Sequence, residues 1–315
     1  MPTSKISVKD IGTSTYYEML HQEADFWERR ARGEVDMSLA ATRDPELAAA
    51  VAGDLLIRTL NLAASRGSRI LELACAEGEL SQQLAQRGCL VDGIDISFSL
   101  VSAGMRRFAS SQQTDPCPGK IRLFVGDLNR LGMAADTYDV VLAIAAFHHV
   151  LDLPSLVVQI KKTLKPGGAL ICLDHMEPSF AGRLLRYLFL LMVPTEVPYW
   201  RKPLHIFNRL MARVYQYLLP RRRAPAAFTL PPRSPFEDIS GSEAVALIRE
   251  HFIVEHYETP QAFANVVAGH LRLSSHEREV KMARRLRRLD DWLVKNLGVR
   301  GETYFLVAHK PECTK

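Results

Sequence analysis

The sequence predicts an α/β protein with a mostly parallel sheet covered by helices on both faces. Short apolar strands alternate with helices between Ser68 and Asp174, the alternation stops after Pro178, and it resumes near Ser242. Such alternation is typical of parallel sheets, because each connection between parallel strands crosses the sheet and is usually a helix. The pattern divides the chain into four parts: an N-terminal helical lid (1–64), a core (65–178), a cap insertion (179–235) and a C-terminal part of the core with the closing strands (236–315).

The N-terminal part is predicted to be helical and to contain no strand. Tyr16, Tyr17, Leu20, Ala24 and Trp27 lie at helical spacing, and 45–60 is a second stretch with the same periodicity. Two interpretations of the aromatic residues stay open: they cover a binding site, or they pack as an ordinary helix face.

The core and the C-terminal part contain the predicted strands. Strands are expected where short apolar runs are bounded by turn residues, and helices where apolar residues recur every three or four positions. The expected core strands are 70–74, 90–94, 121–125, 140–145 and 169–174, and the helices are 79–87, 100–109 and 153–164, with a loop at 110–120. In the C-terminal part, helices 242–251 and 276–297 alternate with strands 252–257 and 303–308.

Composition and cysteine spacing favour an ordinary cytoplasmic protein. Apolar residues make up 47% and charged residues 24% of the 315 positions, and residues 1–5 do not resemble the start of a signal peptide. The longest dense apolar run, 187–193, is far shorter than the roughly 20 residues of a membrane-spanning helix. The five cysteines form no CxxC pair, so we expect neither a metal site nor a disulfide framework.

The positive charge of the chain is concentrated in the predicted cap. Ten Arg or Lys residues and one Glu lie between Ala181 and Pro235, a net +9, which leaves −4 for the remainder of a chain whose total is +5. Leucines and aromatic residues are interleaved with these arginines. The segment 180–223 could bind a large apolar or anionic acceptor and contact a membrane peripherally. Alternatively, it is a helical pair that packs on the core and has solvated arginines.

Three acidic residues mark the ends of successive core strands. The first strand ends in Glu72-Leu-Ala74-Cys-Ala-Glu-Gly78, where small residues allow a ligand to approach the backbone. The turn lacks GxGxxG, and the charge of Glu72 would repel a phosphate and suit a cationic ligand. Asp95 ends the second strand, where a carboxylate can accept both hydroxyls of a ribose. Asp127 ends the third strand.

Together with Tyr138-Asp-Val-Val-Leu142 and Leu164-Lys-Pro-Gly-Gly-Ala-Leu170, these motifs resemble the class I S-adenosylmethionine-dependent methyltransferases. The similarity is to the small-molecule enzymes with a ubiquinone-biosynthesis type of core, and it covers 68–174 well. It implies a Rossmann-like, seven-stranded sheet with an antiparallel closing strand, and S-adenosylmethionine as cofactor.

The same resemblance assigns cofactor-binding roles to individual residues. Those that match the family pattern are Glu72, Ala74 and Gly78 in the cofactor turn, Asp95 at the ribose, Ile96 beside the adenine, Asp127 and Leu128 at the adenine edge, and Ile144 facing the methionine moiety. The family usually has glycine where Ala74 and Ala76 stand. Alanine permits right-handed backbone conformations, so we expect a site that is slightly tighter.

A general base is expected above the ends of the fourth and fifth strands, because methyl transfer to a hydroxyl requires removal of its proton. His149 is the first candidate, since histidine titrates near neutrality, and His148, His175 and Glu177 are the others. In similar enzymes a histidine of this pair often packs under the cofactor instead. The expected activity is therefore O-methylation of a small-molecule, lipid-linked or glycan-precursor acceptor.

Two other functions compete with this prediction. Nucleic-acid methylation would suit the basic, aromatic cap, but the fourth strand is followed by Ile144-Ala-Ala-Phe147 and not by the Asn/Asp-Pro-Pro-aromatic motif of base-amino methyltransferases. A nucleic-acid partner is therefore not expected. A non-catalytic cofactor-binding scaffold would suit the alanines at 74 and 76. The sequence leaves the oligomeric state open.

Overall fold

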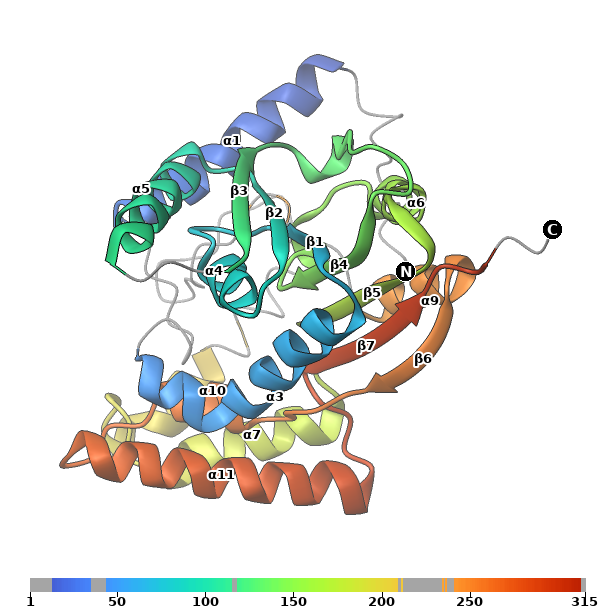
Figure 1. Ribbon diagram of the computed structural model, residues 1–315. Coiled ribbons are helices and arrows are strands. Elements are labelled where there is room, and N and C mark those ends of the chain that lie inside the picture. Colours follow the sequence, from blue (N-terminus) through green and yellow to red (C-terminus); the bar gives the residue numbers. More distant parts are fainter. Residues whose placement is uncertain are drawn as a thin grey trace.

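The computed structural model describes residues 13–34, 44–114, 118–208 and 241–312, together with 211, 234 and 236. Its strands are β1 (Arg69–Leu73), β2 (Leu90–Asp95), β3 (Lys120–Val125), β4 (Tyr138–Ile144), β5 (Leu164–His175), β6 (Ile253–Glu258) and β7 (Thr303–His309). They form one seven-stranded sheet in the order β3-β2-β1-β4-β5-β7-β6 (Figure 1). The first five strands are parallel, and β7 runs antiparallel to both β5 and β6. The predicted mostly parallel, seven-stranded α/β fold is confirmed.

Nine α-helices surround this sheet in the described part of the chain. They are α1 (Thr13–Ala31), α3 (Pro45–Arg66), α4 (Glu79–Gln86), α5 (Phe98–Thr114), α6 (Leu153–Thr163), α7 (Phe180–Met192), α9 (Gly241–His251), α10 (Ala264–Gly269) and α11 (His276–Leu297). The prediction of a loop at 110–120 is wrong for residues 110–114, which are helical. The helix α5 continues to Thr114 because no Gly or Pro lies between Ala109 and Pro116. The short α10 was not predicted, since six residues carry no helical periodicity.

Side chains of β1 alternate between the two faces of the sheet, and each face has its own apolar core. Leu71 and Leu73 pack on one face with residues of α6 and α9, including Ile160 and Ile248. Ile70 packs on the other face with residues of α3 and α4. This two-sided burial fixes the register of the strand, because a shift by one residue would exchange the two sets of side chains.

A third apolar cluster joins α3, α7, α10 and α11 below the sheet (Figure 1). The rings of Phe189 and Phe263 stack at 4.6 Å in this cluster. Asp290 of α11 is fully buried and accepts hydrogen bonds from the backbone N–H groups of Ala262, Phe263 and Ala264. These bonds satisfy donors at the start of α10 that a helix leaves unpaired, so α10 is held firmly in place.

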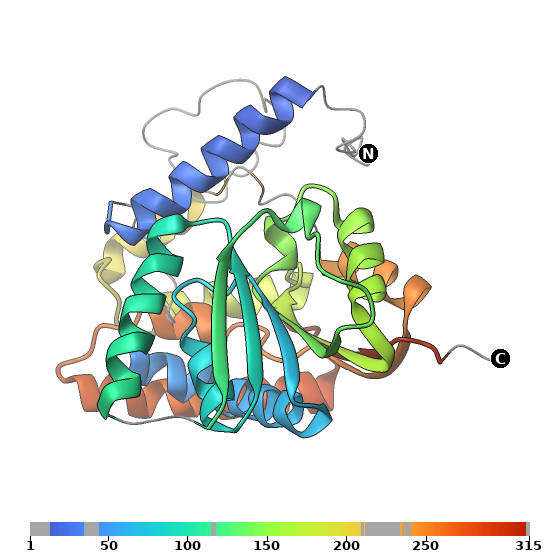
Figure 2. The same cartoon turned by 45° about the horizontal axis from the view of Figure 1, so that its top comes forward.

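The two helices of the predicted N-terminal lid have different surroundings. Figure 2 shows α1 crossing above the carboxyl ends of the strands, with α3 and α11 at the opposite end of the view. By length and mean hydropathy (1.4), α3 could cross a membrane. In the structure it packs against the sheet and α11 through buried residues that include Leu47, Val51 and Leu60, as a core helix does. The four-part division of the chain stays a prediction, and most of 209–240 lies outside the described residues.

Candidate functional site

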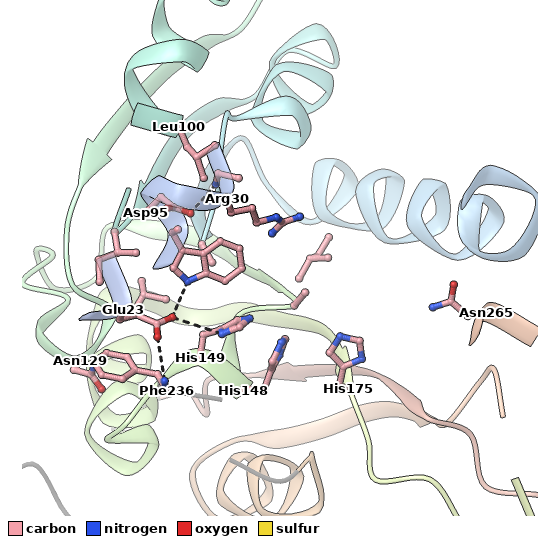
Figure 3. A pocket seen from close by; sticks show the side chains of 17 residues that line it. Glu23, Arg30, Asp95, Leu100, Asn129, His148, His149, His175, Phe236 and Asn265 are labelled. Atoms are coloured by element: carbon pink, nitrogen blue, oxygen red, sulfur yellow. Dashed lines mark hydrogen bonds and ion pairs between the residues drawn. The ribbon is translucent and has the colours of Figure 1, made fainter. Parts of the chain in front are cut away.

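A cavity of about 370 Å³ lies under α1, at the carboxyl ends of β1, β2, β4 and β5. Open parallel sheets bind their ligands at this edge. The residues that line the cavity come from segments far apart in the sequence (Figure 3). They are Glu23, Trp27, Arg30, Ala74, Ala76, Asp95, Ile96, Leu100, Leu128, Asn129, Ile144, Ala145, His148, His149, His175, Phe236 and Asn265.

The turn after β1 has a left-handed backbone at two alanines. Their φ angles are +54° at Ala74 and +47° at Ala76, and Ala145 at the end of β4 has +51°. The expectation that the alanines adopt right-handed conformations is therefore wrong. The turn has to reverse direction so that the N–H of Ala76 can reach Asp95, and a left-handed residue provides this. The fold accepts a strained backbone here, next to the cavity.

Asp95 lies at the centre of the predicted cofactor half of the cavity. Its carboxylate accepts hydrogen bonds from the backbone N–H of Ala76 (2.8 Å) and of Ser97 (2.9 Å), which fix its orientation. Burial raises the pKa of Asp95, and the hydrogen bonds partly oppose this effect. Ile96 and Leu128 provide apolar walls beside it. A carboxylate beside apolar walls fits a ribose joined to a flat heterocyclic base.

Three residues predicted to bind the cofactor do not line the cavity. Glu72 is buried beneath the turn and accepts a hydrogen bond from the Ser81 hydroxyl, and burial raises its pKa to about 7. Gly78 has φ +67° and starts α4. Asp127 accepts hydrogen bonds from the Tyr16 hydroxyl and from Asn129. These three residues thus lie outside the lining of the cavity, and their role toward the cofactor stays a prediction.

Two of the three histidines predicted to be catalytic, His148 and His175, contact one carboxylate, that of Asp174. His148 Nδ1 lies 2.5 Å from Asp174 Oδ1, and the ring centroid of His148 is 4.7 Å from that of His175. Asp174 also accepts hydrogen bonds from the backbone N–H of Ala146 and Phe147. Burial acts to raise the pKa of Asp174, but the charge and hydrogen bond of His148, followed by those of His175, lower it to about 2. Asp174 is therefore ionised, and it accepts a hydrogen bond from the protonated Nδ1 of His148.

His149 has a different environment from His148. Its ring packs edge-on against Trp27 at 4.9 Å, and its Nδ1 lies 3.2 Å from the Ser234 hydroxyl. Burial, followed by the charge of His148, lowers the pKa of His149 to about 3, so His149 is neutral near pH 7. Glu177, the remaining candidate base, accepts hydrogen bonds from Ser242 and is not among the cavity-lining residues.

The helix α1 contributes three cavity residues, of which only Trp27 was expected from the sequence. Glu23, Trp27 and Arg30 follow one another at i, i+4 and i+7, a spacing that puts them on one helix face. This spacing could have indicated Glu23 and Arg30 from the sequence. Glu23 accepts hydrogen bonds from Trp27 Nε1 (2.6 Å) and the backbone N–H of Phe236 (3.0 Å), as well as from Ser234. These contacts join α1 to the end of the predicted cap.

Five other cavity residues, Leu100, Asn129, Ala145, Phe236 and Asn265, were not among the predicted site residues. Burial lowers the pKa of Arg30, while the charge of Asp95 acts in the opposite direction. Among the residues that the structure describes, no group of three or more His, Cys, Asp or Glu side chains is placed to hold a metal ion.

Comparison with known proteins agrees with this geometry. Residues 71–172 match the family model described as "Methyltransferase domain". The chain is 33% identical over 136 residues to a demethylmenaquinone methyltransferase of Symbiobacterium thermophilum, covering 42% of this chain and 51% of that one. It is 27% identical over 131 residues to the ubiquinone/menaquinone biosynthesis C-methyltransferase UbiE of Geotalea daltonii, covering 40% and 54%. The chain therefore spans about half the length of the curated relatives it matches.

A further relative and a solved structure extend the comparison. A ubiquinone biosynthesis O-methyltransferase of Coxiella burnetii is 30% identical over 105 residues, which are 33% of this chain and 42% of that protein. The crystal structure of a putative sarcosine dimethylglycine methyltransferase from Galdieria sulphuraria has a TM-score of 0.52 at 13% identity, and covers 92% of this chain and 99% of that one. The structural likeness shows a shared fold. Residues 71–172 therefore form a methyltransferase domain, and the comparisons support a class I S-adenosylmethionine-dependent methyltransferase.

Proposed function

We propose that this protein transfers a methyl group from S-adenosylmethionine to a hydroxyl group of a largely apolar acceptor. The observation that carries the proposal is the His148–Asp174 pair at the wall of a cavity whose other half has the features of a nucleoside site. Asp95, Ile96 and Leu128 would hold the ribose and the adenine. Bound S-adenosylmethionine would supply an electrophilic methyl group, and the residues of this chain would place the acceptor and take its proton.

His148 is the proposed general base, in preference to His149. Because Asp174 is ionised, the favoured tautomer of His148 donates its Nδ1 proton to Asp174 and keeps the lone pair of Nε2 for the acceptor hydroxyl. The positive charge that develops on His148 is then stabilised by Asp174. The Nδ1 of His149 lies 3.2 Å from the Ser234 hydroxyl and 3.7 Å from Glu23 Oε1, farther from a carboxylate than the 2.5 Å of His148, and the low pKa of His149 makes it a weak base.

The lining of the cavity favours an aromatic acceptor over a sugar. Trp27, Phe236 and Ile144 supply flat or apolar walls, whereas a glycan precursor would need many hydrogen-bonding groups. The relatives named above act, by their names, in menaquinone and ubiquinone biosynthesis. A phenolic or quinol-type ring, free or attached to a lipid tail, is the acceptor class that we propose.

A lipid-linked acceptor is also compatible with the outer surface of α7. Phe180, Leu184, Leu188 and Met192 recur every four residues along this helix and are exposed, Phe180 to 78%. Trp200, eight residues after the helix, is 74% exposed. We propose that this face contacts the cytoplasmic surface of a membrane peripherally. Replacing Leu184 and Leu188 with Asp should then reduce co-sedimentation with phospholipid vesicles, and unchanged co-sedimentation would contradict the contact.

Calorimetric titration with S-adenosylhomocysteine tests the cofactor site. We expect wild-type protein to bind it and Asp95→Ala to weaken binding at least tenfold, about 1.4 kcal/mol. The matched control is Asp25→Ala, which removes an exposed aspartate of α1 and should leave the affinity unchanged. Well-folded wild-type protein that does not bind would exclude the proposed enzyme and favour a non-catalytic protein whose cofactor site is closed, for which the strained alanines would be the structural reason.

Transfer of a radiolabelled methyl group to 1-naphthol tests the base. We expect His148→Ala to lower kcat/KM by about 10²-fold or more, the usual contribution of a general base, and His149→Ala to lower it less. Binding of S-adenosylhomocysteine serves as the folding control for both variants. Equal rates for His148→Ala and the wild type would show that His148 is not the base.

A further inference from the structure

The solvent-facing side of α11 carries a row of cations that the proposed function does not use. Its buried residues, such as Val280, Ala283 and Leu286, face the rest of the protein. On the opposite side, six exposed residues lie at i, i+3, i+4, i+7, i+11 and i+14, a spacing that places them on one helix face: Lys281, Arg284, Arg285, Arg288, Trp292 and Lys295. We call these six residues the cationic face of α11.

The charges of the cationic face are not neutralised by neighbouring side chains. Among the residues that the structure describes, none of the five cations has an ion-pair partner. Arg287 of the same helix differs, because its guanidinium lies 2.8 Å from Asp291 and 3.7 Å from Asp54. Like charges three and four residues apart on a helix repel each other. An anionic partner would therefore relieve a repulsion that α11 otherwise carries.

The cations other than Lys295 also line a hollow in the surface, beside the start of α3. Two carboxylates, those of Glu46 and Glu277, line the same hollow, and Glu46 lies 3.1 Å from His276. Four cations against two carboxylates leave a net charge of +2 when His276 is neutral. Three of the four cations are arginines, whose planar guanidinium can donate two hydrogen bonds to one phosphate. The hollow is therefore suited to phosphate groups.

A phospholipid surface fits these observations better than a nucleic acid does. The helix α7 lies with α11 at the end of the molecule away from α1 (Figure 1), and it exposes Leu184, Leu188 and Met192. Aliphatic side chains can enter the acyl region of a bilayer, whereas the bases of nucleic acids stack on aromatic rings. Trp292 is 53% exposed beside the cations, and tryptophan is enriched at the interface between membrane and water.

We propose that the cationic face of α11 binds the headgroups of anionic phospholipids, so that the protein prefers negatively charged membranes. This binding goes beyond the proposed function and does not depend on methyl transfer. It is also separate from the apolar contact of α7, which does not require charged lipids. Each Lys or Arg close to an anionic bilayer strengthens binding about fivefold. The attraction extends over a Debye length of about 10 Å at 0.1 M salt.

Co-sedimentation of the full chain with two kinds of vesicle tests this assignment. One kind is phosphatidylcholine alone, and the other is phosphatidylcholine with an equal amount of phosphatidylglycerol. At about 0.1 M salt we expect wild-type protein to bind the anionic vesicles at least about a hundredfold more tightly, and to lose most of this preference at about 1 M salt.

A triple variant and a matched control locate the effect. Arg284→Gln, Arg285→Gln and Arg288→Gln together should weaken binding to the anionic vesicles about a hundredfold, because three cations are lost. Glutamine has nearly the helix propensity of arginine, so α11 should still form, and circular dichroism checks this. The control removes three exposed cations of α5, α6 and α9 and should keep the preference: Arg106→Gln, Lys162→Gln and Arg249→Gln.

Three results would overturn the proposal. Wild-type protein that does not prefer the anionic vesicles has no headgroup site on α11. Equal losses in the two triple variants would show that only the net charge of the protein acts, since both variants lose three positive charges. Binding of a single-stranded oligonucleotide, but of neither kind of vesicle, would make the cationic face a nucleic-acid surface. Failure to bind S-adenosylhomocysteine would remove the proposed function and leave this proposal standing.

Discussion

Replacing Ala76 with glycine should stabilise this protein, although alanine-to-glycine changes normally do the opposite. Ala76 has φ +47° and its side chain is exposed, so its methyl group contributes little packing. A left-handed conformation costs an L-residue about 1–2 kcal/mol, and glycine avoids this cost. Glycine also lowers the free energy of unfolding by about 0.4–1 kcal/mol, because the unfolded chain with glycine has more conformational freedom. The midpoints of these two ranges give an expected net gain in the free energy of unfolding of about 0.8 kcal/mol.

The matched control is Ala49→Gly in α3, where the alanine is also exposed but has helical geometry. That change should lower the free energy of unfolding by about 1 kcal/mol, the difference in helix propensity between the two residues. Urea unfolding followed by circular dichroism measures both variants against the wild type. The N–H of residue 76, which donates to Asp95, is present in either variant, so the turn keeps its hydrogen bond.

Opposite signs for the two glycine variants are the result that the structure requires. If Ala76→Gly destabilises the protein as much as Ala49→Gly does, then Ala76 is not left-handed in solution and the reasoning about strain in this turn is refuted. A glycine substitution at Ala74 would not isolate the backbone strain, because that side chain is half-buried and its methyl group packs against the core.

Three further predictions concern the buried titratable groups. Asp174→Asn should lower kcat/KM for methyl transfer by about 10²-fold or more, since the base His148 loses its ionised partner; unchanged affinity for S-adenosylhomocysteine is the control, and an unchanged rate would contradict the assignment. The pKa of His149 is lowered to about 3, so its contribution to stability is complete above about pH 6.5 and is lost as the pH falls toward 3. From pH 7 to 5 the wild type should therefore lose about 2 kcal/mol more than His149→Asn in urea unfolding, and equal losses would show that His149 is not buried in its neutral form. The pKa of Glu72 is raised to about 7, so its contribution is complete below about pH 4.5 and is lost as the pH rises through 7. Glu72→Gln should therefore gain about 2 kcal/mol relative to the wild type between pH 5 and 8, and a constant difference between the two proteins would argue against the raised pKa.

Much of the fold could be predicted from the sequence, because strands and helices bury alternating or periodic side chains that can be read locally. The closing strands were placed within one residue at each end, and His276–Leu297 was predicted with both ends correct. The predictions failed where local signals are weak, at the end of α5 and at α10. The backbone of Ala74 and Ala76 also could not be predicted, since alanine by itself prefers right-handed conformations and only the surrounding turn imposes the other.

The sequence by itself determined the parallel sheet, the order of its strands along the chain and the acidic residues that end them. Only the tertiary structure decided which of these groups meet. It placed His148, and not His149, against Asp174, and it brought Ser234 to Glu23 across 211 positions of the chain. It also placed Asn265, which belongs to no motif, at the wall of the same cavity. The physical reason is that periodic burial is a property of neighbouring residues, whereas hydrogen-bond partners and pKa values depend on distances set by packing between remote elements.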